Sequence, residues 1–370
     1  MEKKINYSRT VVISAVNFNE GGPLTILREC LSEASARLDH TWRIIAYVHD
    51  RSLINEPRVT FFEVPYAKRS WLARLYCEWF YFSRLSKSIQ PDLWISLHDI
   101  TPRVTARRQV VYCHNPSPFY KLSLREACIE PKFAIFNIFY KYVYLAFARR
   151  NSWIIVQQEW LRIEFRKWFG LLPIVVAHPV INEPVSCLRN DQDRRKVIFF
   201  YPALPRVFKN IETLLAAAKL LSSTTNLEFE LRITIDGNEN RYAKILLQTY
   251  RNLKVAKFIG RQTRLQMSEQ YAQASAVLFP SKLETWGLPI SEAKSWNKAL
   301  LVSDLPYAHE SVGNYDKAQF LPAESVTAWA VAMASIIEGT WSPMAAEVKP
   351  PNFPYTRNWT ELLDLLILDL

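Results

Sequence analysis

The chain has 370 residues, of which 49% are hydrophobic and 22% charged, with a formal net charge of +11. This composition excludes a disordered or fibrous protein, and the length suits two domains of ordinary size. No apolar stretch is long enough to span a bilayer, and residues 1–9 are too polar for a secretory leader, so we expect a cytoplasmic protein.

The positive charge is unevenly placed along the chain. Residues 1–180 hold 25 Lys and Arg against 15 Asp and Glu, whereas residues 181–370 hold 21 against 20. A basic half beside a nearly neutral one predicts an anionic partner, either nucleic acid or a phospholipid surface with a lipid pyrophosphate. The five cysteines are scattered without zinc-site spacing, which predicts reduced thiols and no metal site.

The first predicted strand, Thr10 to Val16, leads into a turn that contains Gly21 and Gly22 and then into a helical pattern. A glycine pair between a first strand and a first helix lets backbone amides approach a diphosphate. Ordinary turn chemistry explains such a pair equally well. Further strands are expected at Arg43 to Val48 and Val59 to Val64, followed by an aromatic and basic helical pattern from Lys68 to Lys87.

Two more predicted strands end in histidine. Leu93 to Leu97 is followed by His98 and Asp99, and Gln109 to Tyr112 is followed by Cys113 and His114. The carboxyl ends of parallel strands border the ligand crevice of a doubly wound sheet, where a neutral histidine can donate to a hydroxyl or a phosphate. For any single histidine, a structural role is the more common one.

The segment from Phe119 to Phe169 is unusually aromatic, but its apolar run from Phe133 to Phe147 is too short to span a membrane. It is either a buried helix of the first domain or a helix with one aromatic face in a membrane interface. The first domain is expected to close at Pro179, and Pro184 to Arg195 is predicted to be a linker. Asp191-Gln192-Asp193 matches a metal motif of a different transferase fold, but its place in a linker argues against that role.

The second domain begins with a predicted strand, Lys196 to Tyr201, and a loop that carries Arg206 and Lys209 before a helix. Two fixed cations at a helix N-terminus can neutralise a leaving diphosphate without a metal, although solvated loop cations are the more common case. Gly260, after a predicted strand, opens a loop that would pass a nucleobase.

The stretch 276–310 is predicted to fold as strand, loop, helix and strand. Its strands are Ala276 to Phe279 and Ala299 to Val302, and Pro289 suits the first turn of a helix. This places Glu284 in the loop and Glu292 in the first helical turn, where the helix dipole favours a carboxylate that can accept two hydrogen bonds from vicinal hydroxyls. Gly287 would let backbone amides meet a phosphate.

The string Pro-Ser-x-x-Glu-x-x-Gly-Leu-Pro, followed by Glu-Ala, Ser-Asp-x-Pro and Glu310, resembles the donor-site signature of the retaining family-4 glycosyltransferases of the GT-B fold. The resemblance is strongest over residues 196–310, and it extends to bacterial O-antigen mannosyltransferase-like enzymes. Two departures stand out. Thr285-Trp286 replaces the usual Gly-Phe, which predicts a sugar pocket reshaped by Trp286, and Trp296-Asn297 replaces a small residue and glycine, where Asn can keep the left-handed turn.

The resemblance implies a role for each matching residue. Glu284 would hold hydroxyls of the transferred sugar, Glu292 the nucleotide ribose, and His114 the sugar from the first domain. The catalytic set it implies is Glu284, His114, Arg206 and Lys209. The donor-binding set adds Gly21, Gly22, Gly260, Trp286, Gly287, Leu288 and Glu292, and the candidate acceptor contacts are His98 and Asp99.

The fold we expect is α/β, with two Rossmann-like domains facing each other across a cleft. The domains are residues 1–179, which bind acceptor, and 180–350, which bind nucleotide sugar, with a helix in 351–370 that returns to the first domain. The implied activity is metal-independent, retaining transfer of a hexose from a nucleoside-diphosphate sugar, GDP-mannose before a UDP-sugar. The expected acceptor is a lipid-linked saccharide at the inner face of a bacterial membrane, which the basic first half would touch. Rival interpretations are a UDP-sugar enzyme with a soluble acceptor and a non-catalytic sugar-nucleotide or nucleic-acid binding protein.

Overall fold

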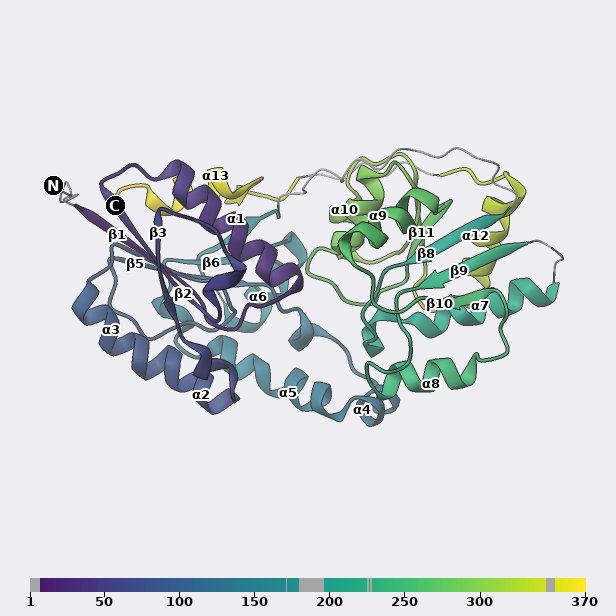
Figure 1. The fold of residues 1–370 in the computed structure, drawn as a ribbon, viewed down its shortest axis with the longest axis horizontal. Coiled ribbons are helices and arrows are strands. Elements are labelled where there is room, and N and C mark those ends of the chain that lie inside the picture. The colour runs from purple at the N-terminus through teal and green to yellow at the C-terminus, as the bar shows by residue number, and fades with distance from the viewer. Residues whose placement is uncertain (1–6, 171, 180–195, 225, 227, 344–349) are drawn as a thin grey trace. The chain divides into compact units, whose positions relative to one another are not determined.

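The computed structural model describes residues 7–170, 172–179, 196–224, 226, 228–343 and 350–370. They divide into two compact units, each around its own parallel sheet (Figure 1). The first unit comprises residues 1–119, 138–180 and 351–370, and the second comprises residues 120–137 and 181–350. The predicted linker, with Asp191, Asp193 and Cys187, lies outside the described residues.

The first unit has an eight-stranded sheet in the order β14-β7-β6-β5-β4-β1-β2-β3, and its described pairings are all parallel. Its strands are β1 (Arg9–Ala15), β2 (Trp42–Val48), β3 (Val59–Glu63), β4 (Leu93–Ser96), β5 (Arg108–Cys113), β6 (Trp153–Val156), β7 (Ile174–Ala177) and β14 (Tyr355–Thr356). Parallel strands covered on both faces read as continuous apolar runs, which is why most of them were predictable. The strand order reverses between β1 and β4, so the ligand crevice of this sheet lies at their carboxyl ends.

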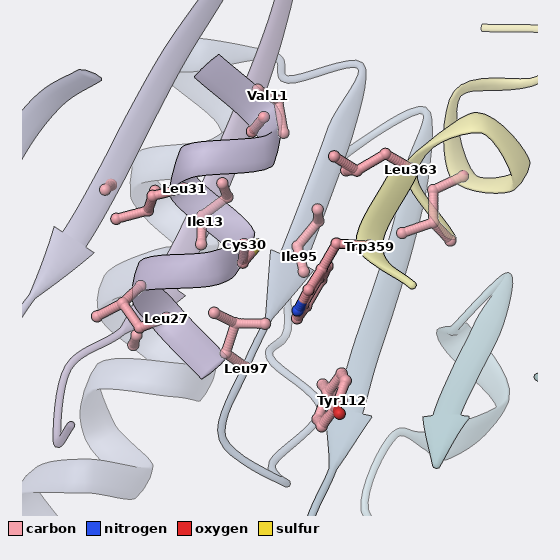
Figure 2. Close-up of a cluster of buried hydrophobic side chains, with 14 of the residues drawn as sticks. Val11, Ile13, Leu27, Cys30, Leu31, Ile95, Leu97, Tyr112, Trp359 and Leu363 are labelled. Atoms are coloured by element: carbon pink, nitrogen blue, oxygen red, sulfur yellow. The ribbon is translucent and has the colours of Figure 1, made fainter. Parts of the chain in front are cut away.

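Helices α1 (Gly21–Arg37) and α13 (Trp359–Ile367) share one core with this sheet (Figure 2). Trp359 stacks on Tyr112 of β5 with ring centroids 5.7 Å apart, and the Arg37 guanidinium contacts the Asp364 carboxylate at 2.7 Å. The end of the chain therefore completes the hydrophobic core of the first unit. Its other helices are α2 (Trp71–Tyr76), a π-helical turn (Cys77–Tyr81), α3 (Phe82–Ile89) and α6 (Glu159–Phe169).

Residues 119–169 contain α4 (Leu124–Ile129) and α5 (Pro131–Leu145). The sequence analysis placed the whole segment in the first domain, but residues 120–137 belong to the second unit. Tyr140 and Tyr144 of α5 are buried, whereas other apolar side chains of the same helix are exposed, namely Ile135, Ile138, Phe139, Tyr142 and Leu145. The helix thus has both a core face and an exposed apolar face.

The second unit has a six-stranded parallel sheet in the order β10-β9-β8-β11-β12-β13. Its strands are β8 (Val197–Tyr201), β9 (Phe229–Ile233), β10 (Ala256–Phe258), β11 (Ala276–Phe279), β12 (Ala299–Ser303) and β13 (Ala318–Leu321). Its helices are α7 (Ile211–Thr224), α8 (Arg241–Thr249), α9 (Arg264–Gln273), α10 (Leu288–Ser295), α11 (Pro306–Val312) and α12 (Val326–Glu338).

The four described cysteines, Cys30, Cys77, Cys113 and Cys128, are free. Within the described ranges, no helix is both long enough and apolar enough to cross a bilayer.

Candidate active site

The strand order of the second sheet reverses between β8 and β11, and the loops that follow these two strands carry Lys209 and Glu284. In a doubly wound sheet, this is the place where ligands bind. The Lys209 ammonium contacts the Glu284 carboxylate, with side-chain exposures of 16% and 13%. Two residues predicted separately from the sequence thus meet at one point.

Local bonds hold the Lys209 loop. A short 3₁₀ turn (Val207–Lys209) ends at Asn210, which has a φ of 55° and a buried side chain. The Asn210 amide donates to the carbonyl of Pro280 at 3.1 Å and to that of Ala323 at 2.7 Å. Asn tolerates the left-handed conformation better than other residues with a side chain, so one residue both turns the loop and ties it to the loop after β11.

An aromatic floor lies beneath the Lys209–Glu284 pair. The Lys209 ammonium is 5.5 Å from the centroid of the Phe279 ring, at the end of β11, and 5.8 Å from that of Phe208. Burial, and after it the Glu284 charge, raises the pKa of Tyr201 and of Tyr307 well above the ordinary value. The Glu284 carboxylate therefore lies in a low-dielectric environment, where a charge-assisted hydrogen bond is stronger than in water.

Glu292 meets a different partner from the one predicted. Helix α10 begins at Leu288, so Glu292 lies beyond the first turn, and the predicted stabilisation by the helix N-terminus was wrong. Its carboxylate instead accepts a hydrogen bond from the Tyr271 hydroxyl of α9. Burial raises the pKa of Glu292 above its ordinary value, against the lowering effect of that hydrogen bond.

Gly287 precedes α10 with a φ of 79°. A Cβ atom there would lie 3.1 Å from Phe279 Cε1 and 3.2 Å from Ile290 Cδ1, so the position excludes a side chain by packing as well as by backbone conformation. The close approach of this backbone to the Phe279 ring places the start of α10 beside the Lys209–Glu284 pair.

We expect Gly287→Ala to destabilise the protein more than Gly339→Ala does. Gly339 has a φ of 72° and nothing within 4 Å of its added Cβ, so it isolates the backbone strain, about 1–2 kcal/mol. Gly287→Ala adds overpacking against Phe279, about 1–3 kcal/mol more. Urea unfolding of both variants measures the difference. Equal losses would show that the close packing at Gly287 carries no weight.

The two departures from the family signature have structural explanations. The Trp286 side chain is 6% exposed, and its indole N–H donates to Ser291 Oγ at 2.9 Å. It is thus a packing residue of the loop, and its predicted effect on a sugar pocket stays a prediction. Asn297 has a φ of 54°, which confirms that asparagine keeps the left-handed turn in place of glycine.

Arg206 is tied to a neighbour. Its Nε donates to the Glu130 carboxylate at 2.8 Å, and its guanidinium lies 4.9 Å from the Phe133 ring centroid. Gly260 has a φ of 66° and follows β10, as expected for a loop opening there. Leu288 is partly exposed at the start of α10.

In the first unit, the predicted residues collect at the carboxyl ends of β1, β4 and β5. Gly21, with a φ of 66°, and Gly22 open α1, as the sequence indicated. His98 is 1% exposed, with Nε2 3.1 Å from the Glu78 carboxylate, and burial keeps its pKa well below the ordinary value. His98 is therefore a neutral interior residue, which argues against the predicted contact with acceptor.

Asp99 organises the loop of His114. Its carboxylate accepts hydrogen bonds from the backbone N–H groups of His114 at 2.7 Å and Asn115 at 3.1 Å. It also accepts from the Tyr140 and Tyr144 hydroxyls, each at 3.2 Å. With these partners and 6% exposure, Asp99 positions the loop. The His114 ring packs edge-on against Phe18 with centroids 5.3 Å apart.

Sequence reasoning missed several partners at these sites. Glu78 is fully buried, and burial raises its pKa to about 8, against the lowering effect of nearby Arg74. The spacing of Arg74 and Glu78, four residues apart on one helical pattern, was a usable signal for this pair. No local pattern announced Tyr271 or Glu130, because their partners are distant in sequence.

Comparison with known proteins adds to this geometry. Residues 189–349 match the family model of glycosyl transferases group 1. The second unit thus carries a group 1 glycosyltransferase domain, on a chain with the fold of the GT-B glycosyltransferases. Family and fold together support a glycosyltransferase.

Individual relatives are distant. The O-antigen chain mannosyltransferase RfbU of Salmonella typhimurium is 22% identical over 273 residues, which cover 71% of this chain and 69% of RfbU. Sucrose-phosphate synthase of Thermosynechococcus elongatus superposes with a TM-score of 0.68 at 14% identity over 90% of each chain. Anabaena HepE, solved with UDP and glucose, superposes with a TM-score of 0.61 at 15% identity over 90% of each chain.

Proposed function

We propose that this protein is a retaining hexosyltransferase that takes its sugar from a nucleoside diphosphate. The observation that carries the proposal is the contact between Lys209 and Glu284 at the switch point of the second sheet. When donor binds, the Lys209 ammonium pairs with the diphosphate and the Glu284 carboxylate accepts hydrogen bonds from sugar hydroxyls, so each charge exchanges its partner for a group of the donor.

In the proposed reaction, the bond between the anomeric carbon and the phosphate oxygen breaks while the acceptor hydroxyl bonds to that carbon from the same face. The acceptor proton passes to the leaving phosphate. Lys209 stabilises the negative charge that develops on the departing diphosphate, and the proposed reaction needs no metal ion for that charge. Arg206 would contribute from the same loop, with the Glu130 carboxylate orienting its guanidinium.

The favoured donor is GDP-mannose or a related GDP-sugar, because RfbU is described as a mannosyltransferase. A UDP-hexose is the second candidate, favoured by the UDP and glucose bound to HepE. A thermal-shift panel of GDP, UDP, GDP-mannose and UDP-glucose tests the proposal. We expect one nucleotide pair to raise the unfolding temperature in a concentration-dependent way. No shift with any nucleotide would overturn the proposal.

The proposed acceptor is a lipid-linked saccharide of surface-polysaccharide synthesis, reached by peripheral contact at the inner face of a bacterial membrane. The exposed apolar residues of the first unit support this, since α2 presents Trp71 and Leu72 beside Lys68 and Arg69. The Trp71 ring packs edge-on against Tyr140 of α5, 5.8 Å between centroids, so the two helices adjoin. Apolar side chains flanked by cations suit an anionic membrane interface.

We expect the protein to float with vesicles that contain phosphatidylglycerol at low salt, and less with phosphatidylcholine alone. Leu72→Ser should weaken this binding, whereas Leu265→Ser, an equally exposed position of the second unit, should not. Flotation that is independent of both lipid charge and Leu72 would contradict the membrane contact.

A further inference from the structure

Residues 120–137 come from the sequence between β5 and β6 of the first sheet, yet they pack as part of the second unit. We call this stretch the α4 segment. Figure 1 shows α4 beside α8, and Arg241 of α8 donates to the Cys128 carbonyl at 3.1 Å. A crossover that only linked two strands would need no such attachment, so its contacts need a separate explanation.

One acidic residue of the α4 segment holds the Lys209 loop. The Glu130 carboxylate accepts from Arg206 Nε at 2.8 Å and from the Val207 backbone N–H at 3.0 Å. These two donors begin the 3₁₀ turn that ends at Lys209. The Phe133 ring completes the contact, 5.5 Å from that of Phe208.

A second acidic residue of the segment holds the Glu284 loop. The Glu126 carboxylate accepts from Lys282 Nζ at 2.7 Å and from the Tyr120 hydroxyl at 2.6 Å. It also accepts from the Ser123 backbone N–H and hydroxyl, which cap α4. Burial would raise the pKa of Glu126, but these hydrogen bonds outweigh it and lower the pKa to about 2. Glu126 is therefore ionised, and its bonds are charge-assisted.

The two loops are also bonded to each other. The Lys282 backbone N–H donates to the Phe208 carbonyl at 2.7 Å, one residue from Lys209 and two from Glu284. One short segment thus places a carboxylate on each loop that supplies a charge to the site. Reactive geometry is sensitive to small displacements, so loops that must present Lys209 and Glu284 together gain from an external brace.

We propose that the α4 segment is a positioning element of the donor site, in which Glu126 and Glu130 set the separation of Lys209 and Glu284 without touching the donor. This inference rests on the proposed function, because it assumes that Lys209 binds the donor diphosphate. It predicts that Glu126 and Glu130 act through Lys209.

The test measures the affinity for GDP and UDP by calorimetry. Glu130→Gln and Glu126→Gln are each expected to weaken binding of the recognised nucleotide about tenfold. Glu269→Gln, an exposed acid of α9, is the matched control and should bind as the unaltered chain does. In a Lys209→Ala background, the same two substitutions should change the affinity by less than about twofold, because their effect passes through the missing ammonium.

The outcomes separate the alternatives. Equal losses with and without Lys209 would make the two acids structural residues and overturn the inference, as would wild-type affinity in both single variants. Glu130→Asp keeps the charge and should recover most of the binding lost in Glu130→Gln, which a folding defect would not predict. If the unaltered chain binds neither nucleotide, the proposed function fails, and this inference fails with it.

Discussion

Replacing Lys209 with alanine is expected to lower the rate of sugar transfer by about 100-fold or more, the usual cost of removing one group that stabilises developing charge. Lys209 is the cation that contacts Glu284, and it lies at the switch point of the second sheet over Phe279. Since the charge on the leaving diphosphate grows as the glycosidic bond breaks, the loss should appear mainly in kcat. Initial rates with the donor found by the nucleotide panel measure it.

A second substitution separates charge from packing at this position. Lys209→Met keeps an aliphatic stem over the Phe208 and Phe279 rings but removes the ammonium, so it should lose as much activity as Lys209→Ala. Lys219→Ala, at an exposed position of α7, controls for the removal of any lysine. Transfer within twofold of the unaltered rate in both Lys209 variants would refute the assignment.

The sequence predicted the strands well because parallel strands buried on both faces are short apolar runs bounded by turn residues. Ala276–Phe279 and Ile174–Ala177 were placed to the residue, as was the helix Glu159–Phe169. Local chemistry also predicted the left-handed turn at Asn297. Each of these features depends on neighbouring residues alone.

The remaining features depend on residues far apart in the chain. Glu130 and Arg206 are 76 positions apart, and Tyr271 and Glu292 are 21 apart, so no periodicity reports either contact. The same reason explains why residues 120–137 were placed in the wrong domain, since helical spacing shows which face is apolar but not which core it joins. Strand β13, with only four residues, is too short to show a period against its helical surroundings.

For Glu292→Gln we expect nucleotide binding at least about tenfold weaker, because a neutral amide cannot accept two charge-assisted hydrogen bonds from ribose hydroxyls. The raised pKa of Glu292, caused mainly by burial, adds a dependence on pH. Only the ionised carboxylate is the strong acceptor, so the affinity of the unaltered protein should rise as pH increases through that pKa. The variant should lose this rise.

The stability of the protein should move in the opposite direction, and this separates a binding role from a folding role. A carboxyl group whose pKa is higher in the folded than in the unfolded state holds more protons when folded, so its effect lowers the free energy of unfolding as pH rises through the folded pKa. Glutamine at position 292 removes that loss while keeping an acceptor for the Tyr271 hydroxyl. Above that pKa, Glu292→Gln should therefore unfold at an equal or higher urea concentration than the unaltered protein, yet bind nucleotide less tightly. If binding and stability fell together, Glu292 would be a structural residue, and the ribose contact would have to lie elsewhere.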